Sequence, residues 1–303
     1  MADSPAVESP TDAAPPRVPV RKNQRDLTAA EKKRFVDAVL ELKRRGEYDE
    51  FVRMHGEFYV TDGELRPRAA HMTPSFFPWH RRYLLEFERA LQRIDERVTV
   101  PYWDWTQDTS ATSSLWADDF LGGTGRTGDR QVTTGPFAYG NGNWTVNSRV
   151  VDGRYLTRDL GRPSDPLTLP TKQDVERALA DPEYDAPPWD STARSGFRNA
   201  LEGWAAGSPE RWRTHNRVHR WVGGLMLGAT SPNDPVFWLH HSFVDLLWER
   251  WRRTHPRSGY LPAAKLPRGD RQHNRVFALD EPLPPWDVTP AELLDHTRWY
   301  RYG

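Results

Sequence analysis

The stretch HNRVHRWVGG, from His215 to Gly224, carries two histidines four residues apart and decides how the rest of the chain is interpreted. On a helix, this spacing places both imidazoles on one face, one turn apart. The zinc-protease pattern H-E-x-x-H has the same spacing, and its glutamate is the general base. Here that position is Asn216, whose amide does not take up a proton. The stretch therefore predicts either an ordinary helix face or a metal site unlike that of a zinc hydrolase.

Two further helices are expected to turn histidines inward. In the segment Pro78–Arg97, His80 lies in one stripe with apolar residues at helical spacing. A helix that begins after the N-cap Asp234 gives His241 the same inward place, whereas its neighbour His240 is rotated by about 100°. Buried imidazoles without partners are costly, so these positions also favour a metal.

The rest of the pattern indicates a helical protein with long loops. A capping box of Thr28 and Glu31 opens another helix, which is expected to end near Gly46. Between residues 106 and 196 the chain is rich in Gly, Pro, Thr and Asp, and its periodicity is weak. We therefore expect a mainly α fold, in which a four-helix bundle core is surrounded by long loop-rich insertions.

Composition excludes several classes of function. The chain has 303 residues, with 42 Lys+Arg balanced by 42 Asp+Glu, so neither nucleic acid nor a membrane surface is an expected partner. No apolar run approaches the length of a membrane span. The absence of cysteine rules out disulfides, thiolate metal sites and a cysteine nucleophile.

The first 22 residues differ from the remainder of the chain. They contain five prolines and no apolar core of the kind that a secretory signal has. We interpret residues 1–22 as a disordered tail and residues 23–303 as a single catalytic domain. The protein is expected to be cytoplasmic unless another protein carries it out of the cell.

Seven of the ten histidines fall into two clusters: His55, His71 and His80; and His215, His219, His240 and His241. Di-iron bundles use mainly carboxylates with paired Glu-x-x-His motifs, and no such pair occurs here. Three imidazoles per ion suit copper, and zinc held by three histidines remains the alternative. The residues alone thus predict two three-histidine metal sites, with copper favoured.

The same segments resemble a known family. HNRVHRWVGG, followed by SPNDPVFWLHHSFVDLLW, is similar to the second copper-binding segment of tyrosinases, and FFPWHRRYLLEFE is similar to the first. PYWDW at residues 101–105 belongs to the same pattern. The resemblance runs from about residue 21 to the C-terminus and is greatest to the small bacterial tyrosinases.

The resemblance implies two copper ions per chain, with O₂ as co-substrate. The implied ligands are His55, His71 and His80 for copper A, and His215, His219 and His241 for copper B. It implies that monophenols are oxidised to o-diphenols and o-diphenols to o-quinones, as in melanin formation. His240 is then left with a supporting role, and Asp245 either orients an imidazole or is a charge on the helix surface.

Four further residues take roles from the resemblance. Glu202 and Asn216 are expected to hold a water that deprotonates the phenol, Arg220 to steer an acidic substrate, and Ala229 to stand at the entrance. The stretch GWAAGSPERWRT, after Glu202, looks longer than in small bacterial tyrosinases. We expect its extra length to form an outward loop around residues 207–209, which leaves Glu202 at the site.

Other functions remain open on the sequence. An o-aminophenol or catechol oxidase would use the same scaffold, a haemocyanin-type oxygen carrier would bind O₂ without turnover, and a zinc hydrolase is disfavoured by Asn216. The resemblance also implies a small helper protein that delivers copper, covers the site and carries the chain out of the cell as a complex. Phenolic small molecules are the expected substrates.

Overall fold

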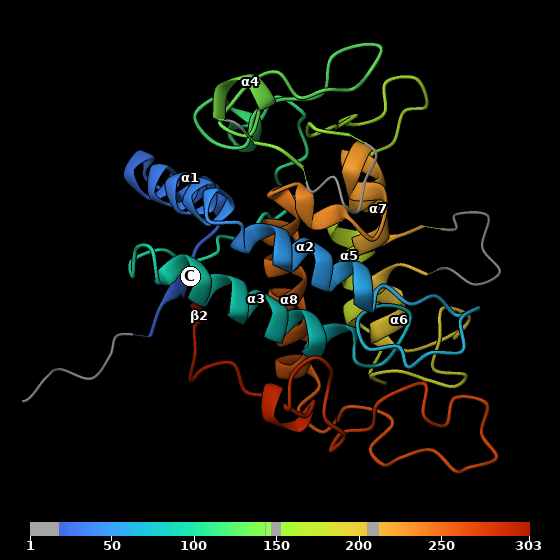
Figure 1. Ribbon diagram of the computed structural model, residues 1–303. Coiled ribbons are helices and arrows are strands. Elements are labelled where there is room, and N and C mark those ends of the chain that lie inside the picture. The colour runs from blue at the N-terminus through green and yellow to red at the C-terminus, as the bar shows by residue number, and fades with distance from the viewer. Residues whose placement is uncertain (1–17, 143, 147–152, 205–211) are drawn as a thin grey trace, which may run out of the picture.

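The computed structural model describes residues 18–142, 144–146, 153–204 and 212–303. Helices dominate these residues, and the only sheet among them has two short strands (Figure 1). None of the described helices has the length and apolar content needed to cross a membrane. The elements, in chain order, are β1 Val20–Arg21, η1 Gln24–Asp26, α1 Ala29–Arg44, α2 Glu47–Phe58, α3 Phe76–Gln92, η2 Ser114–Trp116, α4 Tyr139–Gly142, α5 Lys172–Leu179, α6 Phe197–Glu202, α7 Thr214–Val222, η3 Gly224–Leu227, η4 Ser231–Asn233, α8 Val236–Thr254, η5 Ala291–Leu293 and β2 Arg301–Tyr302.

The first two helices follow directly from local sequence. Thr28 accepts from the Glu31 N–H, and the Glu31 carboxylate accepts from the Thr28 N–H, so the predicted capping box is confirmed. Gly46 ends this unit with a positive φ of 78° and at the same time starts α2. The sequence interpretation took Gly46 only as a stop and missed α2, on which Tyr48, Val52 and His55 share the buried face.

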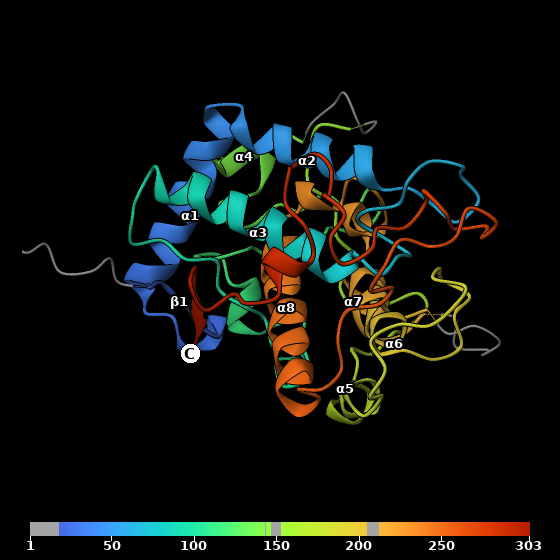
Figure 2. The same ribbon diagram turned by 90° about the horizontal axis from the view of Figure 1, so that it is seen from below.

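Helices α3 and α8 cross at the centre of the molecule (Figures 1 and 2). Aromatic side chains fill the contact: the Phe87 and Trp238 rings are stacked with their centroids 3.6 Å apart. α3 begins at Phe76, two residues before the predicted start, and ends at Gln92 rather than Arg97. Pro78 is its third residue, where the missing N–H still costs no intrahelical bond.

The loop-rich region is held to the start of α8 by a buried ion pair. Both oxygens of Asp234 accept from Arg158, at 2.7 and 2.8 Å, and both side chains are completely buried. Asp234 also accepts from the Val236 N–H, as expected of a residue that caps the helix. The predicted long loops between residues 106 and 196 are confirmed among the described residues, with α4, α5 and η2 as their short elements.

The two described ends of the chain meet beside α3 and α8. β1 pairs in parallel with β2, and Arg21 is completely buried with its Nε 2.9 Å from Glu88. The predicted tail boundary at residue 22 is therefore wrong by several residues, because a buried cation with a carboxylate partner belongs to the folded core. Residues 1–17, the remainder of the predicted tail, lie outside the described residues.

Asp245 belongs to the same buried cluster rather than to the histidines. Its carboxylate accepts from Arg81 at 2.7 Å, from Tyr300 at 2.6 Å and from Tyr302 at 2.5 Å. Neither expectation for Asp245 is correct: it orients no imidazole through a described contact, and it is not a surface charge. It stabilises the crossing of α3 and α8 by joining both to the C-terminal segment.

Replacing Arg21 by alanine is expected to lower the free energy of unfolding by roughly 3–5 kcal/mol. The change leaves Glu88 buried without its cation, although Glu88 still accepts from the Val100 N–H at 2.7 Å. Urea unfolding measures the loss. The matched control is Arg66→Ala, which breaks an exposed pair with Glu64 and should cost less than about 1 kcal/mol. Equal effects of the two changes would contradict a buried role for Arg21.

Candidate metal centre

Two groups of histidines converge in the interior. One group is His55, His71 and His80, and the other is His215, His219, His240 and His241; within each, the possible ligand atoms lie within 4.8 Å of one another. The ligands come from α2, α3, α7 and α8, and His71 comes from the loop before α3. The four helices around the two histidine groups are thus α2, α3, α7 and α8. The sequence predicted α1 and not α2 as the first helix of this bundle.

Backbone carbonyls fix the direction of four imidazoles. The Nδ1 atoms of His55, His80 and His219 lie 2.6, 2.9 and 2.7 Å from the carbonyl oxygens of Ala229, Phe76 and Met226. The Nδ1 atom of His215 lies 3.2 Å from the Glu202 carbonyl and 3.0 Å from the Asn216 side-chain oxygen. A ligating imidazole commonly donates its other N–H in this way, which leaves Nε2 available to a metal.

The nitrogens that face inward have no protein partner that suits them. The Nε2 atoms of His55 and His80 are buried without a hydrogen bond, and the Nε2 atom of His215 lies 3.1 Å from that of His219 and 3.3 Å from that of His241. Buried polar atoms left unpaired are costly, and a cation between several imidazoles removes this cost. Six neutral nitrogen donors fit copper ions in both groups.

Burial keeps these histidines neutral. Loss of hydration lowers the pKa of His55 to about 3 and that of His219 to about 4, although a carbonyl contact to each opposes the shift. Burial likewise lowers the pKa of His71, His80 and His241 well below the ordinary value. Their lone pairs are therefore free for metal binding at neutral pH.

Acid is expected to destabilise the metal-free protein as the pH falls below 6.5, the ordinary pKa of histidine. Below this pH, His55 and His219 bind protons in the unfolded chain. In the folded protein they stay neutral until the pH reaches about 3 for His55 and about 4 for His219. The free energy of unfolding should fall by about 1.4 kcal/mol per pH unit for each of the two. Urea midpoints at several pH values measure the slope. Copper loading should move the loss to lower pH, and a flat profile would contradict the prediction.

His240 is completely buried and belongs to the same group as His215, His219 and His241. Its ring is stacked on His215 with centroids 4.9 Å apart, and the centroid of the Trp105 ring lies 6.4 Å from it. His241 instead stacks on His80 of the other group at 4.3 Å and therefore lies between the two groups. This placement agrees with His241 as the ligand and His240 as its support.

A cavity of about 140 Å³ opens onto these histidines. Asn216 and Arg220 line it, together with Tyr59, Trp204 and Trp212. The Ala229 side chain is not part of this lining, and the described contact of Ala229 with the site is through its carbonyl oxygen to His55. Arg220, which the resemblance places near the substrate, thus lines the cavity, and the sequence interpretation missed the aromatic side chains of its wall.

Glu202 is completely buried behind this cavity. One carboxylate oxygen accepts from the Met72 N–H at 2.7 Å and the other from Arg198 at 3.0 Å. Burial is the main cause that raises the pKa of Glu202, and the charge of Arg198 partly opposes it. Arg198 in turn binds both oxygens of Asp185, at 2.8 and 2.9 Å. Arg198 was missed, although its position four residues before Glu202 signals a helical ion pair.

Helix α6 supports both histidine groups at strained points of the backbone. Met72, directly after His71, has a φ of 54° and donates its N–H to Glu202. Thr214, directly before His215, has a φ of 33°, and its hydroxyl lies 2.7 Å from the Ala200 carbonyl. Such conformations are costly for residues other than glycine, so they persist because the surrounding contacts hold them.

Comparison with known proteins agrees with this geometry. The family model for the common central domain of tyrosinase matches residues 45–254. The chain is 56% identical to a tyrosinase from Streptomyces glaucescens over 285 residues, which cover 93% of this chain and 98% of that protein. It is 47% identical to a grixazone synthase from Streptomyces griseus, over 94% of this chain and 99% of that protein.

Solved structures show the same fold. A polyphenol oxidase from Thermothelomyces thermophila superimposes with a TM-score of 0.61 at 26% identity, over 85% of this chain and 74% of that one. A functional unit of octopus hemocyanin superimposes with a TM-score of 0.58 at 22% identity, over 94% of this chain and 68% of that one, which concerns the fold alone. Because the family model and the tyrosinases both match across the two histidine groups, this chain belongs to the tyrosinase family.

Proposed function

We propose that a water held by Glu202 and Asn216 takes the phenol proton, with Glu202 as the base, in an enzyme that oxidises monophenols to o-diphenols and o-diphenols to o-quinones. The enzyme uses two copper ions and O₂, and the two copper ions supply O₂ binding and electron transfer. The ligands that we propose are His55, His71 and His80 for copper A, and His215, His219 and His241 for copper B. This assignment of copper ligands rests on the buried ring nitrogens of these residues that face inward and lack a suitable hydrogen-bond partner.

The proposed proton acceptor is a water held between the two side chains. The Asn216 side-chain oxygen contacts His215, while its amide nitrogen is buried in the cavity wall without a hydrogen bond. Each oxygen of Glu202 keeps a second lone pair after its contact with Met72 or Arg198. Burial that raises the pKa of Glu202 makes it a better base for a phenol, whose own pKa is about 10.

Two residues act on the substrate in this proposal. Arg220 lines the cavity with its guanidinium 5.6 Å from the centroid of the Trp212 ring, and it steers phenols that carry an acidic group. Ala229 is proposed to act at the entrance through its carbonyl oxygen, which orients His55, since its side chain does not line the cavity.

Oxygen uptake with a monophenol and with its catechol, after copper loading, tests the proposed function. Uptake with both substrates is expected. Uptake with the catechol alone would instead favour the catechol or o-aminophenol oxidase, and reversible O₂ binding without turnover would favour an oxygen carrier. The tyrosinase function is the better supported, because the tyrosinase from Streptomyces glaucescens is more similar to this chain than the grixazone synthase is.

A small helper protein is the proposed partner for copper delivery and export. Leu227, at the rim of the copper cavity, is 55% exposed and offers an apolar contact beside the opening. A partner that covers this rim would protect the site while copper enters, and would carry the complex out of the cell. Coexpression with a candidate helper should raise the copper content per chain, and an unchanged content would count against this partner.

A further inference from the structure

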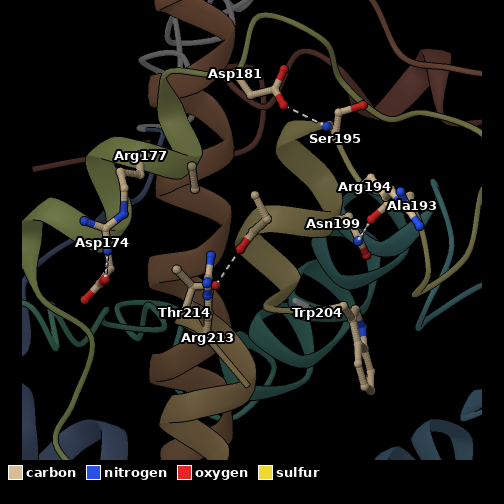
Figure 3. A pocket seen from close by; sticks show the side chains of 13 residues that line it. Asp174, Arg177, Asp181, Ala193, Arg194, Ser195, Asn199, Trp204, Arg213 and Thr214 are labelled. Atoms are coloured by element: carbon tan, nitrogen blue, oxygen red, sulfur yellow. Dashed lines mark hydrogen bonds and ion pairs between the residues drawn. The ribbon is translucent and has the colours of Figure 1, made fainter. Parts of the chain in front are cut away.

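A second cavity, of about 320 Å³, lies beside the copper cavity. Its lining comes from α5, from α6 and the segment before it, and from the start of α7 (Figure 3). Among the described residues, Trp204 is the only one that lines both cavities. Figure 3 shows its indole at one edge of the second cavity, beyond Asn199 and Thr214. The two cavities therefore adjoin at this side chain.

Trp204 is held in place from several directions. Its backbone forms an isolated β-bridge with Trp212, and the two rings make an edge contact with their centroids 4.8 Å apart. The preceding residue, Gly203, has a φ of 99°, and a Cβ there would collide with the Arg213 carbonyl oxygen. The Trp204 N–H also lies 3.2 Å from the Asn199 carbonyl oxygen. The indole is thus fixed by the backbone as well as by packing.

The two cavities differ in chemistry. The copper cavity has aromatic and imidazole walls, whereas two aspartates and three arginines line the second one: Asp174, Asp181, Arg177, Arg194 and Arg213. Asp174 pairs with Arg177, and Asp181 accepts from the Gly196 N–H. Arg194 has no ion-pair partner among the described residues. The second cavity therefore favours an anionic group over a cationic one.

We propose that Trp204 is a specificity-determining partition, which restricts the copper cavity to single-ring phenols by closing it from the second cavity. The second cavity would take an outer ring with an acidic substituent if the indole were removed. This inference rests on the proposed function, because it concerns which phenols reach the copper site. It gives Trp212 the role of a positioning residue that braces the partition.

The partition is tested with two catechols, one with a single ring and one with a benzoate ring attached to it. Catechols avoid the removal of a monophenol proton, which matters because the Trp204 indole N–H acts on the Glu202 carboxylate and lowers its pKa. Wild-type protein should prefer the single-ring catechol in kcat/KM by about tenfold or more. Equal kcat/KM values for the two catechols in the wild type would overturn the proposal without any variant.

Trp204→Ala should reduce this preference by about tenfold, whereas Trp204→Phe, which keeps a ring, should leave the preference within about twofold. Trp299→Ala is the matched control, because Trp299 is partly buried and lines neither cavity. In the Trp204→Ala background, Arg194→Ala should remove the advantage of the benzoate over the corresponding neutral benzamide. A Trp204→Ala protein that holds two copper ions and keeps the wild-type preference would overturn the partition.

The same measurements separate this proposal from the proposed function. If the wild type oxidises the single-ring catechol after copper loading, catechol oxidation stands, whatever the ratio between the two substrates. If it oxidises neither catechol, the proposed function fails first. A changed ratio with an unchanged copper content assigns the effect to the cavity wall rather than to the metal site.

Discussion

His241→Ala is expected to reduce the copper content from two ions per chain to one and to abolish oxidation of both monophenols and catechols. His241 lies between the two histidine groups, with its Nε2 atom 3.3 Å from that of His215 and its ring stacked on His80. Loss of one of three imidazoles leaves two buried nitrogens that cannot hold the ion alone. Metal analysis of the purified protein after copper loading measures the content directly.

His240→Ala is the matched control, because it changes the adjacent residue on the same helix. His240 is completely buried and lies within the same group of possible ligand atoms as His241. Its ring stacks on His215, whereas the ring of His241 stacks on His80. This variant should keep two copper ions, with some loss of stability from the cavity it leaves. Loss of copper in His240→Ala and retention in His241→Ala would reverse the ligand assignment.

Glu202→Gln is expected to lower monophenol turnover by about 10²–10⁴-fold and to leave catechol turnover within a few-fold. Glutamine can still accept from the Met72 N–H but cannot take up a proton. Arg198 retains its two bonds to Asp185, so the fold should survive the change. A catechol is deprotonated more readily than a monophenol and therefore depends less on this base. Oxygen uptake with matched substrates gives both rates.

The control for this change is Glu57→Gln, which removes an exposed carboxylate on α2. It should affect neither rate. Equal losses on both substrates in Glu202→Gln would mean that Glu202 serves the structure by holding Met72 and Arg198. No loss on either substrate would mean that the proton leaves by another route. The catechol or o-aminophenol oxidase would then be the better function.

Local sequence predicted most of the helices that carry the site. The capping box of α1, the i,i+4 histidines on α7 and the inward stripe on α8 all depend on contacts within one or two turns. The ends of α3 were less well predicted, because packing rather than propensity decides where a helix stops. α2 was missed because Gly46 both follows the end of α1 and caps the start of α2. A glycine in the sequence indicates a helix end but does not show that another helix begins there.

The sequence alone was least informative about the position of Glu202 relative to the histidines. The predicted outward loop at residues 207–209 lies outside the described residues. The ends of this insertion, however, are joined by the bridge between Trp204 and Trp212. Glu202 therefore stays beside His215, with its backbone carbonyl 3.2 Å from the imidazole.

By itself, the sequence determined that seven histidines gather in two segments, that two of them share a turn of α7, and that no cysteine is present. These features follow from residue type and spacing, which are local properties. Only the tertiary structure decided that His71 meets His55 and His80, and that Arg198 reaches both Asp185 and Glu202. Buried charges and imidazoles are tolerated only where distant segments bring partners to them, and the packing of those segments is not encoded in any one of them.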